Sequence, residues 1–156
     1  MTSIGNIIGE ICKIVLPIPE ESYLGNYHSS IAICTLSSIK LLKTIAHSDL
    51  LNHISIAGRL LTENKGIDSI IKYSNQNKNL KTIIICGKEV WGHKAGHSLF
   101  QLHKNGINSD GKIIGSTSPD PYLSVSENEV YHFQRNVKLV NLINETELDI
   151  IKQKIL

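Results

Sequence analysis

The sequence predicts an α/β sandwich built on a largely parallel sheet. Short apolar runs of strand length alternate along the chain with segments in which apolar residues recur at helical spacing. The strongest run, "KTIIICG" at residues 81–87, places four buried-type residues in succession and closes on Gly87, a pattern typical of a strand covered on both faces. Because such sheets bind ligands at the carboxyl ends of their strands, the loops that follow the strands are the first candidates for a site.

Three further apolar runs predict strands on either side of this one. They are "SIAICTL" at 30–36, "HISIAG" at 53–58 and "GKIIGS" at 111–116. A last strand is expected around Val137 to Leu142. The loops of most interest therefore follow Leu36, Ala57 and Cys86. The first ~25 residues are less regular, and a flanking strand or helix is expected there.

Helical periodicity fills the segments between these strands. Apolar residues line one face of "GIDSIIKYSNQ" at 66–76 and of "KAGHSLFQLHKNG" at 94–106, where Gly106 is expected to end the helix. Ser126 is followed three residues later by Glu129, which predicts a helix that begins with a capping box. The closing stretch "ETELDIIKQKIL" predicts a final amphipathic helix.

Composition excludes several classes of function. Sixteen basic and fourteen acidic side chains give a net charge of +2, too small and too scattered for a nucleic-acid or membrane-binding surface. The three cysteines, Cys12, Cys34 and Cys86, are far apart and odd in number, which favours reduced thiols over disulfides. No secretory signal is visible, and no apolar run approaches the roughly 20 residues that cross a bilayer. A cytoplasmic protein is therefore expected.

The loop after Ala57, "GRLLTENKGI", is rich in turn-forming residues. Thr62 is a candidate N-cap for the following helix, and Glu63, Asn64 and Gly66 come next. Taken alone, this pattern is more often plain helix capping than a ligand site. The chain contains neither the GxxxxGK[ST] phosphate loop nor the GxGxxG fingerprint of dinucleotide-binding proteins.

The loop after Cys86, "GKEVWGHKAGHS", carries the strongest chemical signal. If the helix already includes His93, its imidazole and that of His97 share one helical face, with Cβ atoms about 5–6 Å apart. Three interpretations are open at this point: a surface histidine pair, a zinc site with HxxxH spacing, and axial ligation of a cofactor metal by one imidazole. "HKAG" matches the HxxG part of the DxHxxG cobalamin signature, although Trp91 replaces its aspartate.

Taken together, the segments resemble the MtrA component of tetrahydromethanopterin S-methyltransferase, the corrinoid-carrying member of a methanogen enzyme complex. The matching stretches are "SSIAICTL", "AGRLLTENKGID", "ICGKEVWGHKAGHSLFQLHKNGI", "KIIGS", "PDPYL" and "FQRNVKLVNLI". They occur in the family's order from about Tyr23 to Ile143. The resemblance implies a Rossmann-like three-layer sandwich and a single corrinoid-binding domain over 1–156, with 1–22 and 144–156 as flanking elements.

The resemblance also implies a site. His93 would be the axial ligand to the cobalt of a cobalamin or other cobamide, a metal that accepts imidazole nitrogen readily. The cofactor would contact Thr35, Leu36, Gly58, Thr62, Glu63, Asn64, Gly87, Glu89, Val90, Gly92, His93, Gly96, His97, Gly115, Ser116, Pro121 and Tyr122. Because the DxHxxG aspartate is absent, another group must orient the His93 ring, and the sequence does not name it. His97 is expected to lie beside the pocket without binding cobalt.

In that family the corrinoid passes a methyl group from a methyltetrahydropterin to the thiol of coenzyme M, and other subunits catalyse the two transfers. By resemblance, this chain is expected to be a methyl carrier that works with partner methyltransferase subunits and is not catalytic alone. The family's membrane-bound form has a C-terminal membrane anchor, whereas this chain reaches Leu156 with only an amphipathic helix, so no direct anchor is expected. The alternatives are a hydrolytic or structural zinc site on His93 and His97, and a cofactor-free interaction module.

Overall fold

A computed structural model describes residues 21–156 of the chain. Five strands and the helices between them alternate along these residues. In chain order they are β1 (Tyr23–Leu24), β2 (Ile31–Cys34), α2 (Ile39–Ala46), the 3₁₀ helix η2 (Asp49–His53), β3 (Ile56–Gly58), α3 (Lys65–Gln76), β4 (Thr82–Gly87), α4 (Ala95–Asn105), α5 (Glu127–Asn136), β5 (Lys138–Ile143) and α6 (Leu148–Gln153). The predicted α/β class is confirmed.

The strands form one sheet in the order β1-β3-β2-β4-β5. Strand β2 pairs in parallel with both β3 and β4, and β4 pairs in parallel with β5, while the short β1 is antiparallel to β3. The carboxyl ends of β2, β3, β4 and β5 therefore lie at one edge of the sheet. The loops that follow β2, β3 and β4 all begin at that edge.

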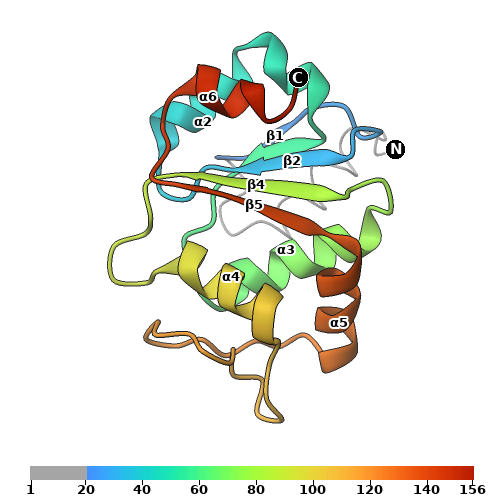
Figure 1. Cartoon of the computed structure of the whole chain (residues 1–156), viewed down its shortest axis with the longest axis vertical. Helices are drawn as coiled ribbons and strands as arrows, with labels where there is room; N and C mark the ends of the chain where they lie inside the picture. The colour runs from blue at the N-terminus through green and yellow to red at the C-terminus, as the bar shows by residue number, and fades with distance from the viewer. Residues whose placement is uncertain (1–20) are drawn as a thin grey trace, which may run out of the picture.

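Helices cover both faces of the sheet, giving three layers (Figure 1). Helices α2 and α6 pack on one face, and α3, α4 and α5 pack on the other. The core on the α3–α5 side is built from the alternate strand residues that face it, such as Cys34, Ile83 and Ile85. The core on the α2–α6 side takes the intervening residues, such as Ile33 and Ile84. Burial on both faces explains why these strands are continuously apolar.

The element boundaries agree closely with the sequence in most places. The capping box at the start of α5 is present, because the Ser126 side chain accepts from the Glu129 amide and the Glu129 carboxylate accepts from the Ser126 amide. Gly106 ends α4 with a φ of 74° and donates its amide to the Leu102 carbonyl. The expected last strand is β5, and the expected final helix is α6.

The strand expected at 111–116 is wrong. This segment belongs to the connection between α4 and α5, where only isolated bridges join Ile107 to Ile113 and Lys112 to Tyr122. Only one of its two isoleucines is buried: Ile113 is 1% exposed, whereas Ile114 is 46% exposed. The segment pairs with none of the five strands of the sheet, and its bridges lie within the connection itself.

Two expectations concern the ends of the chain. Most of the irregular N-terminal segment, together with Cys12, lies outside the described residues 21–156, and β1 follows directly after it. Over the described part of the chain, none of the helices is both long enough and apolar enough to span a membrane. The two described cysteines, Cys34 and Cys86, are buried free thiols as expected.

Candidate functional site

The loops after β2 and β4 are packed tightly together at the carboxyl edge of the sheet. The Ser38 hydroxyl accepts from the Lys88 amide at 2.8 Å, and the Ser37 hydroxyl donates to the Lys88 carbonyl at 2.8 Å. Gly87, with a φ of 76°, brings its backbone so close that an added Cβ would lie 2.2 Å from the Thr35 carbonyl oxygen. Only glycine satisfies both the dihedral angle and the close approach.

His93 lies in a closed turn that precedes helix α4. The Lys94 amide donates to the Val90 carbonyl at 2.9 Å and closes the turn. Lys94 adopts a left-handed conformation with φ 49° and ψ 48°, so α4 begins only at Ala95. His93 is therefore outside the helix, and the shared helical face with His97, which depended on the helix including His93, does not exist.

The carboxylate of Glu63 binds the His93 ring. The Nδ1 atom of His93 lies 2.8 Å from Glu63 Oε2, while the other carboxylate oxygen, Oε1, accepts from the Asp120 amide at 2.9 Å. Glu63 is 1% exposed, whereas the His93 side chain is 54% exposed. The buried carboxylate of Glu63 thus holds the Nδ1 side of the His93 ring, while about half of the His93 side chain is exposed.

This contact determines which imidazole nitrogen is available. An ionised carboxylate only accepts hydrogen bonds, so Nδ1 of His93 holds the proton and donates it to Glu63. In the neutral ring the lone pair then resides on Nε2, the atom that binds a metal in such carboxylate–histidine pairs. Glu63 therefore orients the His93 ring in this chain, which lacks the aspartate of the DxHxxG signature.

The environment of Glu63 favours its ionised form. Burial alone would raise the pKa of this carboxyl, but hydrogen bonds from its own amide, from the Asp120 amide and from the His93 ring outweigh that effect, and the pKa is lowered from its ordinary value of 4.5. The carboxylate is thus fully ionised at neutral pH and is available as an acceptor for His93.

Acidification is expected to remove the stabilisation that Glu63 provides. Because its folded pKa is depressed, the contribution is fully present above pH 4.5 and is lost as the pH falls through the lowered value. Urea unfolding of the wild type and of Glu63→Gln should show a difference in free energy that is large at pH 7 and shrinks below pH 4.5. Glu127→Gln, on the exposed first turn of α5, is the control and should give a small difference. A difference for Glu63→Gln that stays constant with pH would contradict the assignment.

Glu89 has a structural position. Its carboxylate accepts from the backbone amides of Val90, Gly96 and His97, at 2.7 to 3.0 Å. These amides include two from the first turn of α4, whose N-cap residue, Lys94, provides no side-chain cap. Gly96 has to be glycine for this contact, since a Cβ there would lie 2.9 Å from Glu89 Oε2. Glu89 caps α4 through these bonds.

His97 turns toward the connection between α4 and α5. Its Nε2 atom accepts from the Thr117 amide at 3.3 Å and lies 3.3 Å from the Thr117 hydroxyl. Next to it on α4, the Ser98 hydroxyl lies 2.6 Å from the Ser116 hydroxyl and 2.5 Å from the Ser118 hydroxyl. These contacts hold the connection against α4.

The loop after β3 contributes Thr62, Glu63 and Asn64. The expected N-cap at Thr62 is wrong, because α3 begins at Lys65 and its N-cap is Asn64, whose side chain accepts from the Lys65 amide. Thr62 still accepts from the Gly66 amide at 2.8 Å. Asn64 also donates to the Asp120 carbonyl and carboxylate at 3.1 and 3.2 Å, so it ties this loop to the same connection.

The remaining predicted residues have varied positions. Leu36 is fully buried in a left-handed conformation, Thr35 is fully buried with its hydroxyl unpaired, and Gly58 pairs with Cys34 at the end of β3. Pro121 is buried, while Tyr122 is 46% exposed with the Lys112 ammonium 5.9 Å from its ring centre. Gly115 has a φ of 88° and an added Cβ there would lie 2.6 Å from the Gln101 side chain. The structure thus brings Glu63, Asn64 and His93 together, and it leaves Tyr122 beside Lys112.

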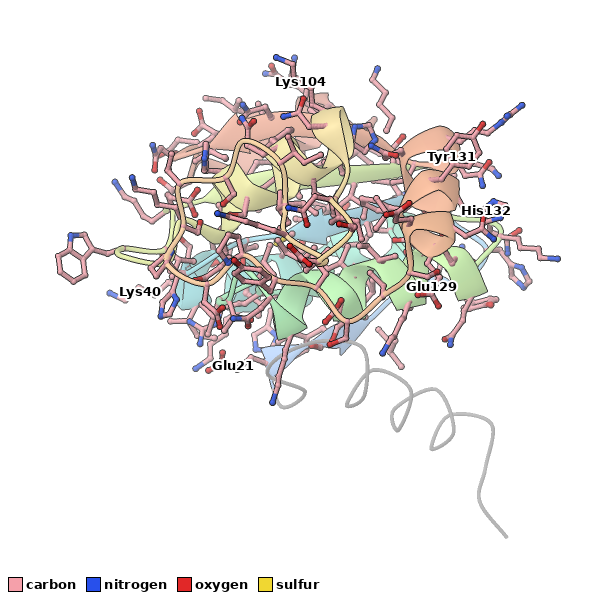
Figure 2. The ribbon with its side chains drawn as sticks, turned by 90° about the horizontal axis from the view of Figure 1, so that it is seen from below. Glu21, Lys40, Lys104, Glu129, Tyr131 and His132 are labelled. Atoms are coloured by element: carbon pink, nitrogen blue, oxygen red, sulfur yellow. The ribbon has the colours of Figure 1, made fainter. Side chains whose placement is uncertain are left out.

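A cleft of about 520 Å³ opens beside the loops after β2 and β4. It is lined by Ser37, Ser38, Ile39, Lys40, Leu41, Thr44, Lys88, Thr146 and Leu148. Figure 2 labels Lys40 at this side of the molecule. His93 is not among the lining residues, so this cleft does not include the Glu63–His93 pair.

The zinc interpretation lacks a ligand set. Among residues 21–156, no three histidine, cysteine, aspartate or glutamate side chains are grouped as metal ligands. Cys86, near the end of the strand before this loop, does not provide a third ligand, because its thiol is buried and lies 3.5 Å from the Cys34 carbonyl. Burial raises the pKa of Cys86, and it raises that of Cys34 to about 12, so both thiols stay protonated at neutral pH.

Three residues in these contacts were not named from the sequence: Asp120, which binds Glu63, Thr117, which binds His97, and Ser98, which contacts Ser116 and Ser118. Asp120 lies in the "SPDPY" turn. The two prolines indicate a restricted backbone, but nothing in the sequence predicts that the Asp120 amide donates to the Glu63 carboxylate. The hydroxyl residues Thr117 and Ser98 belong to no sequence motif that would predict their contacts. A signal for Glu63 did exist: it and His93 both follow parallel strands and both precede helices on the same face of the sheet.

Comparison with known proteins assigns the family. The profile of the MtrA component of tetrahydromethanopterin S-methyltransferase matches residues 16–156. The chain is 39% identical over 135 residues to the A component of the "Putative methyltransferase Mtx" of Methanosarcina barkeri, covering 85% of this chain and 64% of that protein. It is 35% identical over 142 residues to the first of two A components of tetrahydromethanopterin S-methyltransferase from Methanothermobacter thermautotrophicus, covering 89% of this chain and 58% of that protein.

A third relative is covered more fully. The second A component of tetrahydromethanopterin S-methyltransferase from Methanothermobacter thermautotrophicus is 32% identical over 148 residues, and the match covers 78% of that protein. The chain spans less than two thirds of the length of the other two relatives. The family match includes both loops of the Glu63–His93 pair and the connection that carries Asp120. The chain belongs to the MtrA family, that of the A component of tetrahydromethanopterin S-methyltransferase.

Proposed function

We propose that this chain binds a corrinoid cofactor, with His93 as the axial ligand to cobalt, and carries a methyl group between partner methyltransferase subunits. The donor would be of the methyltetrahydropterin type and the acceptor a thiol, as the names of the family and its relatives suggest. The single observation that carries the proposal is the Glu63–His93 pair, because the buried carboxylate holds Nδ1 and leaves Nε2 as the nitrogen for a metal. Cytoplasmic location remains a prediction within this proposal.

The residues present fit a corrinoid. Imidazole nitrogen is a suitable ligand for cobalt, and the Glu63 carboxylate increases the basicity of the ring and holds its orientation. Gly92, next to His93, has a φ of 81° and no atom within 4 Å of the position its Cβ would occupy. The space over Gly92, the residue before His93, is therefore not filled by more distant parts of the chain. When bound, the cobalt supplies the chemistry of accepting and releasing the methyl group.

The chain's own residues bind and orient the cofactor in this scheme. His93 provides the metal ligand, Glu63 holds the proton-bearing Nδ1, and the Asp120 amide fixes the second oxygen of Glu63. Glu89 and Gly96 hold the start of α4, so the turn that presents His93 is fixed at its far end.

Reconstitution with cobalamin tests the proposal. Purified full-length chain mixed with hydroxocobalamin and separated by gel filtration is expected to retain about one cobalt per chain, with a visible spectrum altered from that of free cobalamin. The control is metal analysis of protein purified without added metal. Absence of retained cobalamin would remove the carrier function. Near-stoichiometric zinc that is lost on changing either His93 or His97 would instead support the divalent-metal alternative.

A further inference from the structure

Trp91 is the most exposed large apolar side chain among residues 21–156. It is 95% exposed, whereas the other exposed large apolar residues range from 37% to 70%. It is also the only tryptophan of the chain. An indole has the largest apolar area of any side chain, and leaving all of it in water is unfavourable for an isolated protein. Full exposure leaves the whole indole available for contact with a ligand.

The backbone beneath Trp91 is fixed. Val90, on one side, is 8% exposed and packs in the core, and Ala95, after the turn, is fully buried. The hydrogen bond from the Lys94 amide to the Val90 carbonyl closes the turn between them. Trp91 is thus presented from a short, closed turn with buried ends, and its exposure does not come from a fraying segment.

The same turn presents His93. Only Gly92 lies between Trp91 and His93, so their Cα atoms are at most about 7 Å apart. Glu63 holds the Nδ1 edge of the imidazole, so a metal can bind only from the Nε2 side. A tetrapyrrole-sized macrocycle extends well beyond its central metal in every direction. A corrinoid bound through Nε2 would therefore come within reach of neighbouring residues of the turn.

We infer that Trp91 is a corrinoid-contacting residue whose indole packs against the cofactor on the side of its histidine ligand. This inference rests on the proposed function. Gly92, the residue between Trp91 and His93, adds no side chain between the indole and the ligand. A protein partner is the less favoured occupant. The imidazole fills one axial position of the metal, so a partner that exchanges methyl groups must approach the opposite face, away from this turn.

The test measures cobalamin affinity by calorimetry in the full-length chain. Trp91→Ala is expected to weaken binding roughly tenfold, while Trp91→Phe, which keeps an aromatic ring, stays within about threefold of the wild type. Tyr131→Ala is the matched control: Tyr131 is 52% exposed on α5, and Figure 2 shows it at the opposite side of the molecule from Lys40. Its affinity should equal that of the wild type.

A second readout does not depend on affinity. Oxidation of Trp91 by N-bromosuccinimide, followed by mass spectrometry of its peptide, should be slower in the cobalamin-loaded chain than in the apo chain. Equal affinity for Trp91→Ala and wild type, together with equal oxidation rates, would overturn the inference and leave the proposed function intact. If the wild type binds no cobalamin, both fail; if binding depends on His93 but not on Trp91, only the inference fails.

Discussion

Replacing Gly87 by alanine is expected to destabilise the fold by about 3 kcal/mol or more, whereas Gly92→Ala should cost about 1 kcal/mol. Gly87 is the last residue of β4, Gly92 lies in the loop that follows, and the two have similar positive φ angles, 76° and 81°. The conformational strain of alanine is therefore comparable at the two positions. The two substitutions differ in what the added methyl group meets.

At Gly87 the new Cβ would lie 2.2 Å from the Thr35 carbonyl oxygen and 2.9 Å from the Ser38 side chain. At Gly92 it would meet no atom within 4 Å. Relieving the Gly87 clash requires the loops after β2 and β4 to separate, which breaks the bonds between Ser37, Ser38 and Lys88. Urea unfolding of the apo chain measures both costs. Equal destabilisation by the two variants would show that φ strain alone operates.

The central strands were predictable from sequence because they are buried on both faces. In β4 four successive residues, Ile83 to Cys86, are at most 4% exposed, so the apolar run in the sequence directly reports the strand. The 111–116 segment contains two adjacent isoleucines, but only Ile113 is buried. Whether an apolar run enters a sheet depends on which neighbours cover it, and those neighbours are distant in sequence.

The site was predictable in part. The resemblance and the strand-to-helix position identified His93, but not its partner. Glu63 and His93 are thirty residues apart in sequence, and their 2.8 Å contact exists only because α3 and α4 cover the same face of the sheet. The left-handed Lys94 was equally hidden, since lysine carries no preference for that conformation. That one residue moves His93 out of the helix and separates it from His97.

Replacing His93 by alanine is expected to weaken cobalamin binding at least about 100-fold and to remove the imidazole-dependent features of the visible spectrum. His97→Ala is the matched control, because His97 is the neighbouring histidine and its Nε2 contacts Thr117. Its loss should change the affinity by no more than about threefold and leave the spectrum unchanged. Visible titration of the three proteins gives both quantities.

Glu63→Gln separates ligand identity from ligand orientation. Glu63 accepts from two donors at once, His93 Nδ1 on Oε2 and the Asp120 amide on Oε1. A glutamine has one oxygen and one NH₂ group, so when its oxygen accepts from the Asp120 amide, its NH₂ group faces Nδ1 and no longer holds the ring proton on that nitrogen. Affinity should fall by about tenfold while the imidazole spectrum persists. An unchanged spectrum in His93→Ala would remove the axial-ligand role, whereas unchanged affinity in Glu63→Gln would show that the ring is oriented by other contacts.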